Sequence, residues 1–307
     1  MKKVCFSIAA FILSWITLDW VVSTFFQVGL EKYYGLDQEA DILLIGHSHM
    51  MKSCDKEKLE QALKCKVSKY CREGVMVRDR YAMVKHFLET QKDGSVPYVL
   101  YGVDPFMFHE GDLSLNSYKL FYPFMDHEII DSLVRSEVST WYDYPIHKYI
   151  RCTRITDNMI YRSLRGWCGY WTSFQNGNIS DERWNAEYKW GVFMPEKTVQ
   201  TFHKTINFLI EKGCHVILVH PPVAEGYKKG NPEAFDYMMA YYQQMADDSP
   251  HIDFLDYGKQ FSHCQNIFED PVHVNREGAK KITEALITDL KLIMNNHQNE
   301  DLNATAN

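Results

Sequence analysis

Residues that could form a nucleophilic site stand in two short motifs, far apart along the chain. Ser48 lies in Gly-His-Ser-His at positions 46–49, directly after an apolar run at 42–45. Such a run, ending at a glycine, predicts a buried strand that delivers the serine onto a tight turn. The second motif, Asp-Pro-Val-His at 270–273, supplies a carboxylate and an imidazole.

A turn of this length can hold the Asp270 carboxylate against one nitrogen of His273, which fixes the tautomer and stabilises the imidazolium. The other ring nitrogen can then face the Ser48 hydroxyl. We therefore predict Ser48 as the catalytic nucleophile that carries an acyl group. His273 is the predicted general base and then acid, and Asp270 orients it. Neither motif is specific alone, because serines are common in turns after strands.

Four further residues are predicted to line the site, namely His47, His49, Asp104 and His220, which flank the serine or end a predicted strand. In the plainer interpretation, the two histidines beside Ser48 are polar groups at the sheet edge that hydrogen-bond to backbone. The alternative is a metal site drawn from these residues together with Asp270 and His273. No spacing such as H-E-x-x-H supports it, so we predict no metal and no cofactor.

The elements that position these residues follow from hydrophobic patterning. Short apolar runs alternate with amphipathic ones, which indicates a parallel sheet covered by helices. Strands are predicted at 42–46, 66–70, 98–103, 215–220 and 252–255, and helices at 56–63, 77–90, 196–212, 232–246 and 276–295. The pattern predicts an α/β fold with a flavodoxin-like, doubly wound, five-stranded parallel sheet in a domain of residues 38–295. Ligands of such sheets bind at the carboxyl ends of the strands.

An aromatic-rich stretch at about 109–195 interrupts this alternation. We predict an insertion over the active edge rather than an independent domain. Its rings could stack on sugars or hold an acyl chain, and the plainer alternative is a small core of its own. Its tryptophans are Trp141, Trp167, Trp171, Trp184 and Trp190. The polar residues 296–307 are predicted to form a frayed, flexible tail.

Residues 1–30 predict a membrane anchor. Lys2 and Lys3 precede an apolar segment long enough to cross a bilayer, and the positive-inside bias then places the remainder outside the cytoplasm. No A-x-A cleavage site follows, which favours an uncleaved single-pass anchor over a removed signal peptide. Asp19 interrupts the segment. It either marks the outer interface or pairs with a polar group of a membrane partner.

Composition excludes one class of function and leaves the disulfides open. The 307 residues suffice for a substantial core, and 33 basic against 40 acidic residues give a net charge of -7, which argues against nucleic acid as a partner. The chain has 8 cysteines. In an exported domain Cys65 could pair with Cys71, or Cys152 with Cys168, or all could stay free.

With a serine after the first strand and Asp-x-x-His before the last helix, the chain resembles the SGNH, or GDSL-like, hydrolase superfamily over about 41–290. In that family a glycine after the second strand and an asparagine after the third complete the oxyanion hole. Gly74 matches the glycine, so the resemblance implies oxyanion donors at Ser48 and Gly74. Asp104, in Gly-Val-Asp at 102–104, replaces the asparagine.

Loss of one oxyanion-hole donor typically costs about 3 kcal/mol of transition-state stabilisation. Asp104 is therefore either protonated or turned toward the arginines at positions 72, 78 and 80. The hole is then rebuilt from the amides of Ser48 and Gly74, or the site is slow.

The anchor and the Gly-x-Asp-Pro-Phe run at 102–106 are similar to a membrane-anchored branch that includes teichoic-acid D-alanyl transfer and alginate O-acetylation proteins. That resemblance implies an extracytoplasmic serine esterase or O-acyl transferase on the cell membrane. It would act on acylated glycan or another envelope polymer, beside a membrane-bound O-acyltransferase. The alternative is a catalytically poor scaffold that binds glycan or holds such an acyltransferase.

Overall fold

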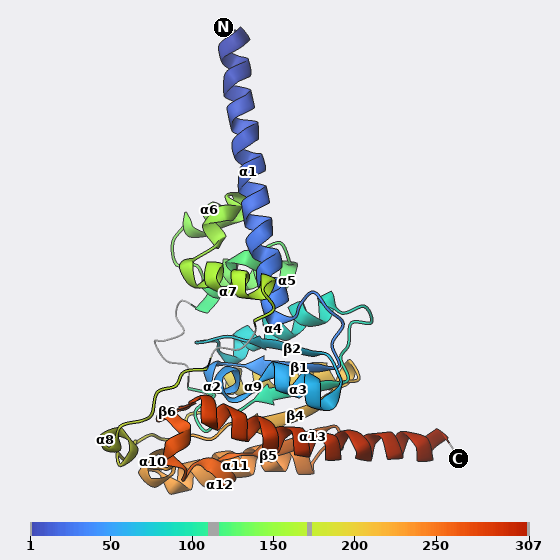
Figure 1. Ribbon diagram of the computed structural model, residues 1–307, viewed down its shortest axis with the longest axis vertical. Coiled ribbons are helices and arrows are strands. Elements are labelled where there is room, and N and C mark those ends of the chain that lie inside the picture. The colour runs from blue at the N-terminus through green and yellow to red at the C-terminus, as the bar shows by residue number, and fades with distance from the viewer. Residues whose placement is uncertain (1, 110–116, 171–173, 306–307) are drawn as a thin grey trace.

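A five-stranded parallel sheet forms the centre of the computed structural model, which describes residues 2–109, 117–170 and 174–305 (Figure 1). The order is β2-β1-β3-β4-β5, with every neighbouring pair parallel. This order confirms the predicted flavodoxin-like, doubly wound sheet. The strands are β1 Ile42–Gly46, β2 Val67–Cys71, β3 Tyr98–Gly102, β4 His215–His220 and β5 Ile252–Asp256.

Helices cover both faces of the sheet because alternate side chains of its strands point to opposite sides. Leu43 and Ile45 of β1 join a core under α4, α9 and α11, whereas Ile42 and Leu44 join a second core under α2, α3 and α13. These helices are α2 Ser48–Ser53, α3 Lys56–Leu63, α4 Val77–Thr90, α9 Glu196–Glu211, α11 Pro232–Asp247 and α13 Arg276–Thr305.

The smaller elements lie in the insertion and around the last helix. The insertion holds η2 Ser117–Phe124, α5 Glu128–Glu137, α6 Asp143–Tyr149, η3 Arg151–Arg154, α7 Asp157–Trp167 and α8 Asp181–Trp184. Later in the chain come α10 Glu225–Gly230, α12 Gly258–Phe261, η4 Gln265–Ile267 and the antiparallel pair β6 Phe268–Asp270 and β7 His273–Val274.

Helix α13 continues past Asn295 to Thr305, through the segment that the sequence predicts to be frayed. His297 stacks on Tyr98 at the amino end of β3, with ring centroids 5.8 Å apart, and also contacts the ring of His215. These contacts join residues far apart along the chain, so the polar composition of the tail does not reveal them.

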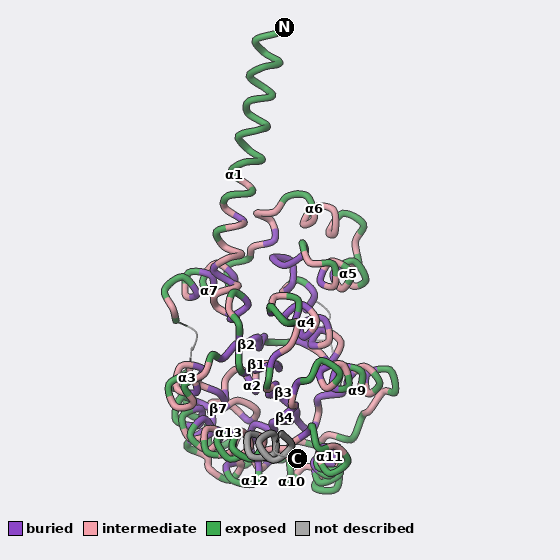
Figure 2. The backbone as a smooth tube through the Cα atoms, turned by 90° about the vertical axis from the view of Figure 1, so that its right-hand side faces the viewer, coloured by how far each residue is buried: buried purple, intermediate pink, exposed green. Residues whose placement is uncertain are grey.

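The N-terminal helix α1, Lys2–Tyr34, is long and apolar enough to cross a membrane. Its first half is exposed and its second half packs on the insertion (Figures 1 and 2). The Asp19 carboxylate accepts hydrogen bonds from the backbone N–H groups of Arg151, at 2.9 Å, and Cys152, at 2.7 Å. The Asp19 carboxylate is therefore bound by the chain's own η3.

Helices α1 and α7 cross with their backbones in contact at two glycines. A Cβ atom on Gly166 would lie 1.9 Å from the carbonyl oxygen of Gly29, and one on Gly29 would lie 2.1 Å from the Ser163 hydroxyl. Below the crossing, Leu30 and Tyr34 are fully buried in the main core. The second half of α1 is thus part of the domain.

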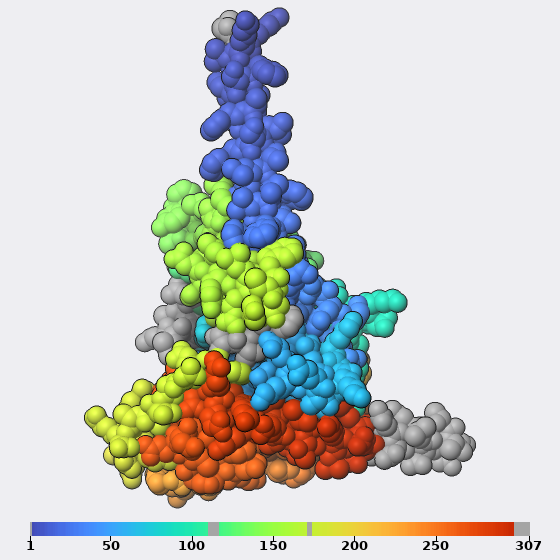
Figure 3. Space-filling model, viewed as in Figure 1, coloured from blue at the N-terminus to red at the C-terminus, as the bar shows by residue number. Residues whose placement is uncertain are grey.

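The insertion lies mainly around α1, which corrects the expectation that it covers the active edge as a whole (Figure 3). The physical reason is the apolar surface of α1: the ring of Trp167 stacks on Phe25, with centroids 5.4 Å apart. Among its described residues, His109 at the start of the insertion lines the cleft, and the later part reaches the active edge where Trp190 meets Phe106 edge-on at 5.8 Å. Trp184 packs on Phe268, Trp141 is exposed, and Trp171 lies outside the described residues.

The described residues include all 8 cysteines of the chain, and each is a free thiol. Neither Cys65 with Cys71 nor Cys152 with Cys168 is paired in the structure.

We expect Gly166→Ala to lower the free energy of unfolding by about 1–3 kcal/mol, because the added methyl group overpacks the crossing with α1. The sign of this change is informative, because replacing glycine by alanine within a helix normally stabilises the helix by about 1 kcal/mol. Urea unfolding in detergent micelles measures the change. Gly191→Ala is the control, because nothing lies within 4 Å of its added Cβ. Equal stability of the two variants would contradict the close crossing.

Candidate active site

The structure brings Ser48, Asp270 and His273 into one hydrogen-bonded chain. The Nε2 atom of His273 lies 2.8 Å from the Ser48 Oγ, and its Nδ1 lies 2.8 Å from Oδ2 of Asp270. The first and third of these residues are 225 positions apart in sequence. This is the arrangement that can remove a proton from a serine hydroxyl and hold the resulting imidazolium.

Ser48 is positioned by the turn between β1 and α2. Two glycines at strand ends allow α2 to sit against the sheet edge: a Cβ on Gly46 or on Gly102 would come within 2.9 Å of the Met50 Cβ. His47 caps the helix, because its Nδ1 accepts the backbone N–H of His49 at 3.1 Å. The serine is therefore the first helical residue, at the rim where the parallel strands end.

The β6–β7 turn positions the other two residues of this hydrogen-bonded chain, Asp270 and His273. Oδ1 of Asp270 accepts the backbone N–H groups of Val272 and His273, both at 2.9 Å, which leaves Oδ2 for the imidazole. Burial opposes ionisation of Asp270, but the His273 side chain and these amides outweigh it and lower the pKa of the carboxyl to about 2. The turn is tied to the loop after β4 by the Ala224 N–H, which donates to the Pro271 carbonyl at 2.7 Å.

A cleft of about 380 Å³ opens beside the serine, and Gly74 lies on its wall. Gly74 has a φ of 71°, a left-handed conformation that favours glycine. Among the described residues, neither the Ser48 nor the Gly74 backbone N–H has a hydrogen-bond acceptor. An oxyanion hole built from these two amides requires N–H groups without an acceptor, so this finding is compatible with the predicted donors. The other residues that line the cleft and were not predicted to do so are Val75, Met76, Arg80, Phe106, Met107 and His109.

Of these, Phe106 has a signal in the sequence because it follows Asp104 in the Gly-x-Asp-Pro-Phe run, and Arg80 is one of the arginines considered as partners of Asp104. The others come from the loop between β2 and α4 and from the loop after β3, where no motif marks them. Their approach to Ser48 depends on how α4 packs across β1 and β3. Periodicity predicts such a helix but not the side chains that it turns toward the cleft.

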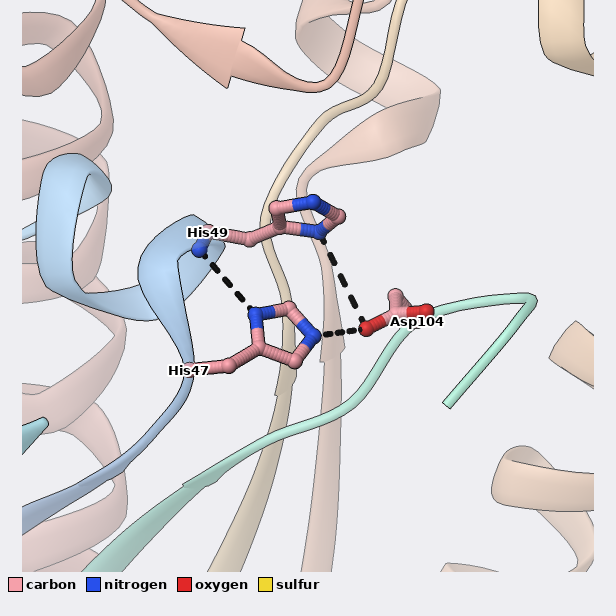
Figure 4. A group of neighbouring side chains, drawn as sticks. All are labelled: His47, His49 and Asp104. Atoms are coloured by element: carbon pink, nitrogen blue, oxygen red, sulfur yellow. Dashed lines mark hydrogen bonds and ion pairs between the residues drawn. The ribbon is translucent and has the colours of Figure 1, made fainter. Parts of the chain in front are cut away.

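Asp104 faces His47 rather than an arginine (Figure 4). Its Oδ2 accepts from the His47 Nε2, and its Oδ1 accepts the Phe106 N–H at 2.9 Å. Burial opposes ionisation, but the hydrogen bond from His47 and the charge of Arg80 hold the pKa of the Asp104 carboxyl well below its usual range. The predicted alternative of a protonated Asp104 is therefore disfavoured, and the carboxylate contributes no donor to an oxyanion hole.

The hydrogen bonds of His47 also define its tautomer. Nδ1 accepts a backbone N–H, so the ring proton is on Nε2 and is donated to Asp104. Burial lowers the pKa of His47, which keeps the ring neutral. His47, His49 and Asp104 are close enough together to form a three-ligand group, but a protonated Nε2 has no lone pair for a metal. This arrangement favours the plainer interpretation of His47 as a backbone-bonded polar group.

His49 and His220 have different surroundings. The buried His49 ring packs edge-on against His273, with centroids 5.2 Å apart, and burial lowers the pKa of His49 well below its ordinary value. His220 is fully buried at the end of β4, where its Nδ1 lies 2.8 Å from Asp256. His220 is not among the residues that line the cleft, which corrects its predicted position there. The carboxylate of the neighbouring strand β5 holds it inward.

No protein-family model matches the chain, and no curated protein matches its sequence. Solved structures that are similar to it include two of low identity. A candidate platelet activating factor from Streptococcus pneumonia is 14% identical with a TM-score of 0.38, and the match covers 92% of this chain and 99% of that one. A lipase from a goat rumen metagenome is 11% identical with a TM-score of 0.41, over 80% and 94% of the chains. The function proposed below therefore rests on side-chain geometry.

We expect Asp104→Ala to cost about 1–3 kcal/mol of unfolding free energy, because it leaves the partly buried, neutral His47 N–H without its acceptor. Asp253→Ala is the matched control. It breaks a second histidine–aspartate contact, with His215, whose carboxylate is 41% exposed against 1% for Asp104. We expect that loss to be at most about 1 kcal/mol. Urea unfolding measures both, and equal losses would contradict the buried pair.

Proposed function

We propose that the chain is a membrane-anchored, extracytoplasmic serine esterase or O-acyl transferase that acts on acylated cell-envelope glycan through an acyl-Ser48 intermediate. The hydrogen-bonded chain from Asp270 through His273 to Ser48 carries this proposal. The resemblance of the two motifs to SGNH hydrolases agrees with it. So does the cleft beside the serine, which can admit the acyl carbonyl.

In the first half-reaction, the Ser48 Oγ attacks the carbonyl carbon of the acyl ester while His273 Nε2 takes the hydroxyl proton. The backbone N–H groups of Ser48 and Gly74 stabilise the oxyanion. The ionised Asp270 carboxylate stabilises the imidazolium. As the tetrahedral intermediate collapses, the ester C–O bond breaks, His273 returns the proton to the leaving alcohol, and the acyl group stays on Ser48.

In the second half-reaction, His273 takes a proton from an incoming hydroxyl, which attacks the acyl-Ser48 carbonyl. The tetrahedral intermediate then releases the Ser48 Oγ, which recovers its proton from His273. Water as the incoming group gives hydrolysis, and a sugar hydroxyl gives transfer to glycan.

An aromatic wall next to the cleft supports a sugar-containing substrate. We define it as Phe106, Trp190, Tyr188 and Tyr227. Phe106 lines the cleft, and its ring centroid lies 5.8 Å from that of Trp190 and 5.0 Å from that of Tyr227. Tyr188 stacks on Tyr227 at 4.6 Å. Flat apolar faces of this kind suit the faces of sugar rings.

The packing of α1 supports anchoring by an uncleaved helix. Its first half is exposed and apolar, as a membrane span requires. Its second half supplies Leu30 and Tyr34 to the core, and the Asp19 carboxylate caps η3. Cleavage after the apolar segment would remove these contacts, so we infer that α1 stays attached to the domain.

A second candidate function is a catalytically poor scaffold that binds glycan or holds a membrane-bound O-acyltransferase. The observation that favours it is Asp104, a carboxylate bound by His47 where SGNH enzymes have an amide donor. The hole then has only the two backbone donors. The missing donor is worth about 3 kcal/mol of transition-state stabilisation.

We expect Ser48→Ala to abolish covalent labelling by a fluorophosphonate probe, because the serine oxygen forms the new bond to phosphorus as fluoride leaves. Loss of the nucleophile of such a triad lowers the acyl-transfer rate on the order of a million-fold. Gel fluorescence of the full-length protein in detergent measures the labelling. The fold should persist, since the change removes one oxygen atom.

Ser249→Ala serves as the matched control, because that serine only caps a turn with the His251 N–H at the other end of β5. It should label like the unaltered protein. Labelling of Ser48→Ala at the unaltered rate would exclude Ser48 as the nucleophile. If the unaltered protein is not labelled at all, the scaffold function is favoured.

A further inference from the structure

The short helix α6 presents an apolar face that no described element covers. We define the α6 apolar face as Trp141, Tyr142, Ile146, Tyr149 and Ile150, each at least 40% exposed, with Trp141 at 88% and Tyr149 at 79%. Positions 142, 146, 149 and 150 fall on one side of a helix. These side chains form a single patch of rings and aliphatic groups on the outside of the insertion.

The opposite side of α6 is bound to the domain by polar contacts. Lys148 and the Tyr144 hydroxyl both bind the Asp131 carboxylate of α5, at 2.7 and 2.8 Å. Asp143 accepts the hydroxyl of Tyr122 at 3.0 Å. The helix is therefore held in one orientation, and the α6 apolar face is turned outward by its attachment.

The position of α6 relative to α1 indicates what covers this face. The Asp19 carboxylate binds the N–H groups of Arg151 and Cys152, directly after the face ends at Ile150. This fixes the end of α6 beside the point where the exposed half of α1 ends. Both views place α6 at the end of the domain from which α1 emerges (Figures 1 and 2).

The length of the exposed apolar part of α1 places the end of α6, beside Asp19, at the bilayer surface. From Val4 to Leu18, its fully exposed part, the helix rises about 21 Å at 1.5 Å per residue, less than the hydrocarbon core of about 30 Å. The residues around Asp19 must therefore approach the outer boundary of the membrane for α1 to span it. Side chains fixed at that level meet the interfacial zone, which tryptophan and tyrosine rings prefer.

We propose that the α6 apolar face inserts into the outer interface of the lipid bilayer, as a second membrane contact beside α1. This inference rests on the anchoring part of the proposed function. A single helix lets a domain tilt and rotate, whereas two contacts define its orientation. The cleft at Ser48 is thereby held at a constant height and direction over the membrane surface, which suits a substrate tethered to the envelope.

The test uses tryptophan quenching in the full-length protein, reconstituted in phosphatidylcholine nanodiscs. One sample has ordinary lipid, and the other has acyl chains brominated near the headgroup, which quench only tryptophans in contact with the bilayer. Subtracting the spectrum of each Trp→Phe variant isolates the emission of one tryptophan. We expect the emission assigned to Trp141 to be largely lost in brominated nanodiscs.

Two other variants act as references. Trp15→Phe reports on the exposed half of α1, and we expect Trp15 emission to be quenched. Trp184→Phe reports on Trp184 of α8, which packs on Phe268, and we expect Trp184 emission to be unquenched. Quenching of Trp15 and Trp141 but not of Trp184 is the supporting result.

The alternative results separate the two proposals. Quenching of Trp15 without Trp141 overturns insertion of the α6 apolar face and leaves the anchor in place, whereas quenching of neither overturns both. Trp141 could also be unquenched in nanodiscs yet shielded from acrylamide in native envelope membranes. A protein partner would then cover the face, and the lipid proposal would be wrong. Fluorophosphonate labelling of Trp141→Phe tests the catalytic proposal independently.

Discussion

The structure depends on one hydrogen bond between distant parts of the chain, from the Ser48 hydroxyl to His273 Nε2. Two features allow it to form. Strand β1 lies beside β3 within the parallel sheet, and the turn after β1 is held against the edge where the strands end. The turn packs tightly, since Gly46 and Gly102 leave space for Met50 alone. On the other side, backbone amides fix Asp270 before it meets the imidazole.

The residues around this bond also bind one another. His47 stands directly before the serine, Asp104 follows the third strand, and the two are hydrogen-bonded to each other. The pair holds the buried Asp104 carboxylate as a hydrogen-bond acceptor, so the proposed oxyanion hole relies on backbone donors. At the other end of the molecule, the Asp19 carboxylate of α1 likewise finds its hydrogen-bond donors within the chain, in η3.

Local patterns were sufficient for much of the fold and for three side chains of the site. Apolar runs such as 42–46 predict the strands, and Ser48, Asp270 and His273 are found because turn motifs carry them. The packing of α7 on α1, the inward turn of His220 toward Asp256 and the cleft wall from α4 were not predictable in this way. Each depends on which elements meet in space, and a single sequence contains no periodic signal for that.

The central claim is that Ser48 becomes an activated alcohol through His273. Peptide mapping by mass spectrometry after brief exposure of the full-length protein to an activated acetyl ester, followed by acid quenching, tests it directly. The account predicts an acetyl group on the peptide that contains Ser48 and its absence from the same peptide of a His273→Ala variant. Acetylation at other residues only, or equal acetylation of Ser48 in that variant, would contradict the account.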